Sequence, residues 1–273
     1  MIDYFLSVFS FELILLFLLL GSVVGLLAGL FGVGGGIVTV PVLIFGLPLV
    51  GVPVAHAIHT AVGTSLATIV VTSLSAIRAH HRRGGVIWPE FRRLAPGILV
   101  GAWLGGGIAN MLAGPVLQRI FGVFVLGVGL RMILLYPGDG QGRSLSALVK
   151  SVAGVGIGVV SAMVGIGGGA LTVPFLHLLG VDMKRAVATS SACGLPIAVA
   201  GAGSFMVMGW GVAGLPEGSL GYVYWPVALI VVLTSALLAP LGALLAHRLP
   251  GSRLRRVFGL FLLVVGIKLT IFI

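Results

Sequence analysis

Two groups of small polar residues in this chain have the types and the spacing to bind an anion. In each group, glycines are followed within a few dozen residues by threonine and serine. Backbone N–H groups at a glycine turn or a helix start favour negative charge, and hydroxyls donate further hydrogen bonds. The candidate residues are Gly32, Gly34, Gly35, Gly36, Thr39, Thr64 and Ser65 in the first group and Gly165, Gly167, Gly168, Gly169, Thr172, Thr189 and Ser190 in the second.

Each of these residues also has a structural interpretation. Glycines let helices in membranes pack closely, and hydroxyls in apolar helices often bond to their own backbone. One glycine triplet alone would favour packing. Two copies at matched positions favour a break in the backbone at a binding site.

The two groups belong to an internal repeat. The segment 29–41 reads GLFGVGGGIVTVP, and the segment 162–174 reads AMVGIGGGALTVP. Shorter motifs further along the first half also return in the second. Repeats that each carry a glycine-broken apolar segment are typical of membrane proteins built from inverted copies. We therefore predict a first inverted repeat over 1–138 and a second over 145–273, together forming a single embedded domain.

Composition predicts the fold class. Hydrophobic residues make up 59% of the chain, charged residues 8%, and the mean hydropathy is +1.23. A soluble domain would carry about a quarter charged residues. Segments that cross a bilayer must satisfy their own backbone groups, which favours helices. We expect an all-α polytopic membrane protein with segments at about 11–31, 36–50, 55–78, 94–112, 116–136, 146–165, 168–181, 186–209, 222–246 and 254–272.

Two of these segments are too short to cross. The stretches 36–50 and 168–181 span about 21 Å as helices, against about 30 Å for the hydrocarbon core. Each contains a proline and follows a glycine triplet. We therefore predict short half-helices or re-entrant segments at these two places.

The loop charges predict an orientation. Nearly all of the 16 Lys and Arg residues fall on one side if the basic loop 78–93 is placed in the cytoplasm. Both termini are then extracytoplasmic, and matching loops of the two halves carry opposite charge, as inverted repeats require. The isoelectric point is near 11.1. Because the basic residues that raise it lie in short loops between apolar segments, as this bias predicts, we expect no nucleic-acid partner.

Few titratable residues fall within the apolar segments. The acidic residues lie in loops or at segment ends, so the carboxylate of a typical proton relay is missing. His59, five residues before Thr64, is the first candidate for a proton role, with a structural role as the alternative. Arg131 and Lys268 occupy matching places in the two halves. They would either reach the lipid headgroups or attract anions.

Catalytic and cofactor motifs are missing from the sequence. It contains no His-Glu-x-x-His pattern, and its single cysteine cannot form a cysteine-rich metal site. We therefore expect no enzyme activity, no cofactor and no bound metal.

The glycine elements followed by Thr-Val-Pro, with Gly-Thr-Ser in the first half and Ala-Thr-Ser in the second, resemble the TauE/SafE family of sulfite exporters. The resemblance covers essentially the whole chain. It implies a multi-pass permease of the cell membrane that moves sulfite, a related sulfur oxyanion or an organosulfonate, usually outward. The alternative is a non-transporting membrane partner of a sulfur-metabolism enzyme. The sequence leaves the anion, the coupling ion and the oligomeric state open.

Overall fold

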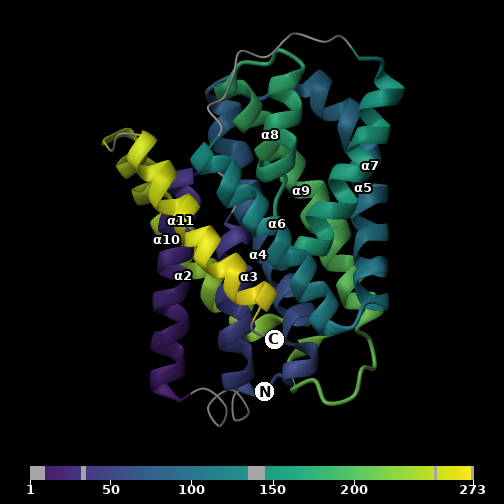
Figure 1. Ribbon diagram of the computed structural model, residues 1–273, viewed down its shortest axis with the longest axis vertical. Coiled ribbons are helices and arrows are strands. Elements are labelled where there is room, and N and C mark those ends of the chain that lie inside the picture. Colours follow the sequence, from purple (N-terminus) through teal and green to yellow (C-terminus); the bar gives the residue numbers. More distant parts are fainter. Residues whose placement is uncertain (1–9, 32–34, 135–144, 249–250, 272–273) are drawn as a thin grey trace.

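The computed structural model describes residues 10–31, 35–134, 145–248 and 251–271. Helices and one short β-hairpin make up the regular structure of this part (Figure 1). In the first half the elements are α2 (Phe11–Phe31), α3 (Gly36–Gly46), the 3-10 turn η1 (Leu47–Val50), α4 (Val54–Arg82), α5 (Trp88–Met111) and α6 (Gly114–Leu134). In the second half they are α7 (Ala147–Val164), α8 (Gly169–Leu178), α9 (Met183–Met208), β1 (Ser219–Leu220), β2 (Val223–Tyr224), α10 (Trp225–Arg248) and α11 (Gly251–Ile271).

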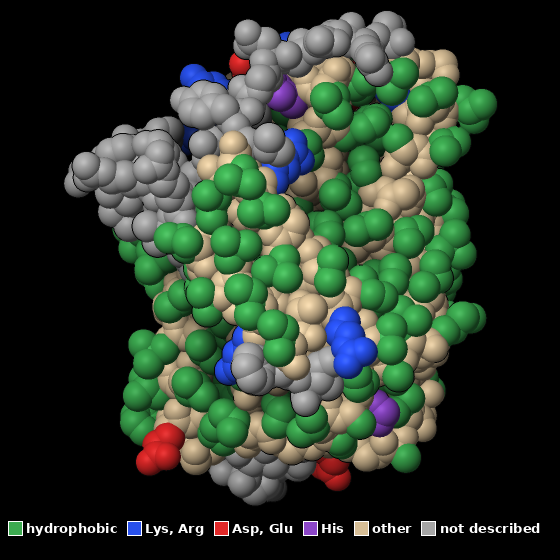
Figure 2. Space-filling model, viewed as in Figure 1, with side chains coloured by type: hydrophobic (Ala, Val, Ile, Leu, Met, Phe, Trp, Pro, Cys, Tyr) green, Lys and Arg blue, Asp and Glu red, His purple; other side chains and the backbone are tan. Residues whose placement is uncertain are grey.

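The predicted all-α membrane fold is confirmed. By length and composition, five described helices can cross a membrane: α4, α5, α6, α7 and α9. The helices α2, α10 and α11 are also long, with 21, 24 and 21 residues. Large apolar side chains such as Leu19 and Leu237 are more than half exposed, as expected for a surface that faces lipid. Figure 2 shows hydrophobic side chains spread over the middle of one face, with charged groups toward its upper and lower parts.

Two boundaries differ from the sequence prediction. The basic stretch 78–93, expected as a loop, is largely helical, because α4 continues to Arg82 and α5 already begins at Trp88. Pro89 suits the first turn of a helix, where its missing N–H is not needed, and so extends α5 backward. The loop between α9 and α10 contains the hairpin β1–β2, which hydropathy did not indicate.

The predicted short half-helices are present. The helix α3 has 11 residues and α8 has 10, and each contains a proline, Pro41 or Pro174. Gly35 before α3 has a φ of 76°, and Gly165 at the end of α7 has a φ of 70°. Side chains other than hydrogen rarely tolerate this left-handed conformation. At the end of α7, the N–H of Ile166 donates to the Ser161 oxygen at 2.9 Å, which ends the helix at the glycine.

Helices pack across the two halves in exchanged pairs, in which one helix comes from the first half and its partner from the second. The first helix α2 packs along α10, and α7 packs along α5, on opposite sides of the molecule in Figure 1. The pairs α4–α9 and α6–α11 complete the arrangement. Glycines allow the close approach: Gly25 of α2 lies against Ser235 of α10, and Gly158 of α7 lies against Ile98 of α5. The first helix of each half therefore pairs with the fourth of the other.

Candidate functional site

The glycine break of the second half is joined to the first half by close contacts. A methyl group added to Gly36 would lie 2.5 Å from the carbonyl oxygen of Gly165 and 2.9 Å from the Cα atom of Ile166. The hydroxyl of Ser65, on α4, donates to the same Gly165 oxygen at 2.9 Å. The structure thus brings Gly36, Ser65 and Gly165 of the candidate set together.

A second cluster forms at the start of α8. A methyl group at Gly168 would lie 3.0 Å from Thr172 Oγ1 and 3.2 Å from the Ser190 carbonyl oxygen. Gly167 lies beside this cluster, because a methyl group at Gly194 of α9 would be 4.0 Å from its Cα atom. The structure therefore gathers Gly167, Gly168, Thr172 and Ser190 around the N-terminus of α8.

The candidate threonines of α4 and α9 bond to backbone in matching ways. Thr64 Oγ1 accepts from the N–H of Tyr224 at 3.0 Å, and Thr189 Oγ1 accepts from the N–H of Ile87 at 2.9 Å. Both N–H groups lie directly before a Trp-Pro pair that begins a helix, α10 or α5. Each threonine therefore fixes a helix start in the opposite half. The repeated Trp-Pro pair is the sequence signal for this role, and it was not among the predicted site residues.

The remaining candidate glycines are placed only in part. Gly35 caps α3, and its carbonyl oxygen accepts from Thr39 Oγ1 at 3.0 Å. Gly169 is the first residue of α8. Gly32 and Gly34 lie outside the described residues.

His59 belongs to α4, is 5% exposed and packs against the C-terminal end of α5. Its Nε2 lies 3.1 Å from the Ala109 oxygen and 3.2 Å from the Leu112 oxygen, so this nitrogen donates its hydrogen to those carbonyls. The ring stacks on Tyr222, with 5.1 Å between ring centres. The last carbonyls of a helix need such donors. The geometry therefore favours a structural role for His59.

We expect His59→Gln to retain the fold and the transport activity, since glutamine also presents an N–H donor. His59→Ala should lower the stability by about 1–3 kcal/mol, because the α5 carbonyls lose a buried donor. Thermal unfolding of the purified variants and flux across a pH series would measure both effects. A well-folded His59→Gln variant with abolished flux would instead require a titrating histidine.

The two basic candidates lie at the ends of the last helix of each half. Arg131 and Lys268 are exposed and belong to the last turns of α6 and α11. Lys268 Nζ lies 4.3 Å from the centre of the Phe45 ring on α3, in a cation–π contact. Lys268 therefore contacts the short helix α3 of the other half near its C-terminal end.

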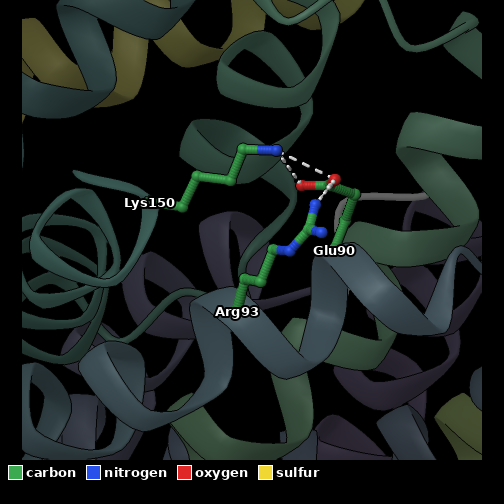
Figure 3. A network of polar contacts seen from close by, with 3 residues as sticks. All are labelled: Glu90, Arg93 and Lys150. Atoms are coloured by element: carbon green, nitrogen blue, oxygen red, sulfur yellow. Dashed lines mark hydrogen bonds and ion pairs between the residues drawn. The ribbon is translucent and has the colours of Figure 1, made fainter. Parts of the chain in front are cut away.

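The described carboxylates lie at helix starts or in a loop. Glu12 and Glu90 occupy the first turns of α2 and α5, Asp182 caps α9, and Glu217 lies before β1. Glu90 is paired, with its oxygens 2.7 and 2.9 Å from Lys150 Nζ and one of them 2.8 Å from Arg93 Nη1 (Figure 3). Among the described residues, the nearest neighbours of the glycine breaks are thus apolar side chains, backbone atoms and hydroxyls, and include no carboxylate.

This fold defines a polytopic membrane protein in which the short helices α3 and α8 each begin at a glycine, and the placed hydroxyl candidates lie on these two helices and on α4 and α9. The family model described as sulfite exporter TauE/SafE matches residues 17–269. The chain therefore belongs to the TauE/SafE family of membrane transporters.

Individual relatives agree with the family match. A Haemophilus influenzae protein called a probable membrane transporter protein is 41% identical, over 95% of this chain and 98% of its own length. Proteins of the same description from Methanocaldococcus jannaschii and Xylella fastidiosa are 29% and 31% identical over 95% and 90% of this chain, and 96% and 91% of their own lengths. No solved structure matches the chain.

Proposed function

We propose that this protein exports sulfite, a related sulfur oxyanion or an organosulfonate across the cell membrane. The observation that carries the proposal is the uncapped N-terminus of α8 with the buried, unpartnered hydroxyls of Thr172 and Ser190. The described carboxylates lie at helix starts or in a loop. Helix N-termini and hydroxyls favour an anion, whereas a cation would need carboxylate or carbonyl oxygens. The name of the matched family supplies the sulfite and the direction.

We further propose that 1–138 and 145–273 are inverted repeats of one transport domain. The exchanged pairs α2–α10 and α7–α5 support this, since a two-fold axis relating the halves would produce them. The matching bonds of Thr64 and Thr189 to helix starts of the opposite half support it too. The loop charges support extracytoplasmic termini.

The membrane potential can drive such an export. Each negative charge that leaves a cell with a negative interior gains about 2.3 kcal/mol per 100 mV. A divalent anion would gain about 4–5 kcal/mol, which corresponds to more than a thousandfold gradient at equilibrium. This mechanism needs no proton-binding carboxylate within a span.

The proposal is tested with purified protein in liposomes under a potassium-diffusion potential. We expect flux of at least one of sulfite, thiosulfate, sulfate and sulfoacetate, and a response to the potential. Cysteines introduced at the exposed positions Arg83 and Glu217 report the orientation of the protein in the membrane. The native Cys193 is fully buried, so it should add no background labelling. Labelling of Arg83→Cys from the extracytoplasmic face of cells would overturn the orientation.

Flux that follows an imposed pH gradient and ignores the potential would contradict the driving force. Liposomes that move none of the four anions would contradict transport itself. That second result would favour the alternative function, a membrane partner of a sulfur-metabolism enzyme.

A further inference from the structure

Two buried hydroxyl groups, that of Thr172 on α8 and that of Ser190 on α9, have no hydrogen-bond partner among the described residues, and both residues border Gly168 at the start of α8. The exposed fraction is 0% for Thr172 and 1% for Ser190, and both hydroxyl oxygens are without a donor or an acceptor. Native proteins bond nearly all such groups, because a buried hydroxyl has given up its hydrogen bonds to water. These two hydroxyls are therefore available to a ligand.

The equivalent hydroxyls of the first half are already used. Thr39 donates to the oxygen of Gly35, four residues earlier, at 3.0 Å. Thr172 stands four residues after Gly168 in the same way, and yet it makes no such bond. Ser65, the equivalent of Ser190, donates to Gly165. The two halves share these residues and differ in which hydroxyls remain free.

The free hydroxyl of Thr172 points to the uncapped N-terminus of α8. It would lie 3.0 Å from a methyl group at Gly168, the residue before the helix. The neighbouring helices α7 and α9 are capped by side chains, since Ser146 and Asp182 accept from their first turns. No side chain caps α8, so its first N–H groups are left for another acceptor.

A third hydroxyl borders the same place. A methyl group at Gly194 of α9 would lie 3.1 Å from Ser73 Oγ of α4 and 3.7 Å from the Gly168 nitrogen. Ser73 is 6% exposed. The surroundings of the α8 N-terminus are therefore neutral, buried and rich in donors, which suits an oxyanion whose charge is spread over several oxygens.

We propose that the transported oxyanion binds at the N-terminus of α8, held by the first N–H groups of that helix and by the hydroxyls of Thr172 and Ser190. At the equivalent place in the first half, the hydroxyls of Thr39 and Ser65 hold internal hydrogen bonds and have a structural role. This inference rests on the proposed function and narrows its site to one half of the repeat.

The test compares equivalent substitutions in the two halves. Thr172→Val and Ser190→Ala should each weaken sulfite binding to the purified protein about tenfold, since each removes one donor to the anion. Their unfolding temperatures should match or exceed that of the unsubstituted protein, because no internal bond is lost. The matched variants Thr39→Val and Ser65→Ala should instead unfold at lower temperature and lose less affinity.

Three results would overturn the inference while leaving transport intact. One is unchanged sulfite affinity in Thr172→Val and Ser190→Ala. Another is an equal loss of affinity in Thr39→Val and Ser65→Ala. The third is a lowered unfolding temperature of Thr172→Val equal to that of Thr39→Val, which would make its hydroxyl an internal donor. Absence of anion flux in the unsubstituted protein would refute the proposed function first, and the inference with it.

Discussion

Replacement of Gly36 by alanine is expected to reduce anion flux about tenfold or more. The added carbon would lie 2.5 Å from the Gly165 oxygen, 2.9 Å from the Ile166 Cα atom and 3.0 Å from Ile69 Cδ1. Two of these neighbours belong to the backbone, and the Gly165 oxygen is also held by Ser65. Such overpacking costs about 1–3 kcal/mol or more and would force the two glycine breaks apart.

Gly156→Ala provides the matched control. Gly156 lies on α7, and a methyl group added there would have no neighbour within 4 Å. Alanine is also the better helix former, by about 1 kcal/mol. This variant should therefore keep the flux and unfold at the same or a higher temperature. Unchanged flux and unfolding temperature in Gly36→Ala would show that the contact between the breaks is dispensable.

Substitution of Glu90 by glutamine should destabilise the protein by about 3–5 kcal/mol, the loss typical of breaking a buried ion pair. Lys150 Nζ lies 2.7 Å from Glu90, and the side chains are only 8% and 15% exposed. The pair joins α7 to α5 (Figure 3). Without the carboxylate, the Lys150 ammonium would stay buried and uncompensated. Thermal unfolding of the purified variant measures the loss.

The other half of the chain suggests the rescue. The repeat equivalents of Glu90 and Lys150 are Val227 and Phe17, both fully buried, on the paired helices α10 and α2. The double variant Glu90→Val with Lys150→Phe should recover most of the lost stability, because an apolar contact can replace a buried ion pair. If the double variant were no more stable than Glu90→Gln, the proposed equivalence of the halves would be weakened at this contact.

Arg93→Gln is the control for charge alone. Arg93 bonds to the same carboxylate at 2.8 Å, and its side chain is 47% exposed. Because water already solvates this half-exposed guanidinium, the variant should lower the stability by at most about 1 kcal/mol. A larger cost would mean that the network depends on all three members.

The sequence by itself determined the membrane helices and their breaks. Apolar length and glycine position are local properties, so the short helices α3 and α8 begin where the triplets predicted. Helix bounds differed from the prediction where local signals competed. At 88–93 the basic residues suggested a loop, while Pro89 in a first turn favoured the helix that forms.

Only the tertiary structure decided which polar groups remain free. Thr39 and Thr172 follow a glycine at the same spacing, yet only Thr39 is bonded among the described residues. The partners of Thr64 and Thr189 lie 160 and 102 residues away in the chain. Lys150 and Glu90 are separated by 60 residues. A hydrogen-bond partner is supplied by whichever segment packs against the residue, and no local pattern encodes that choice.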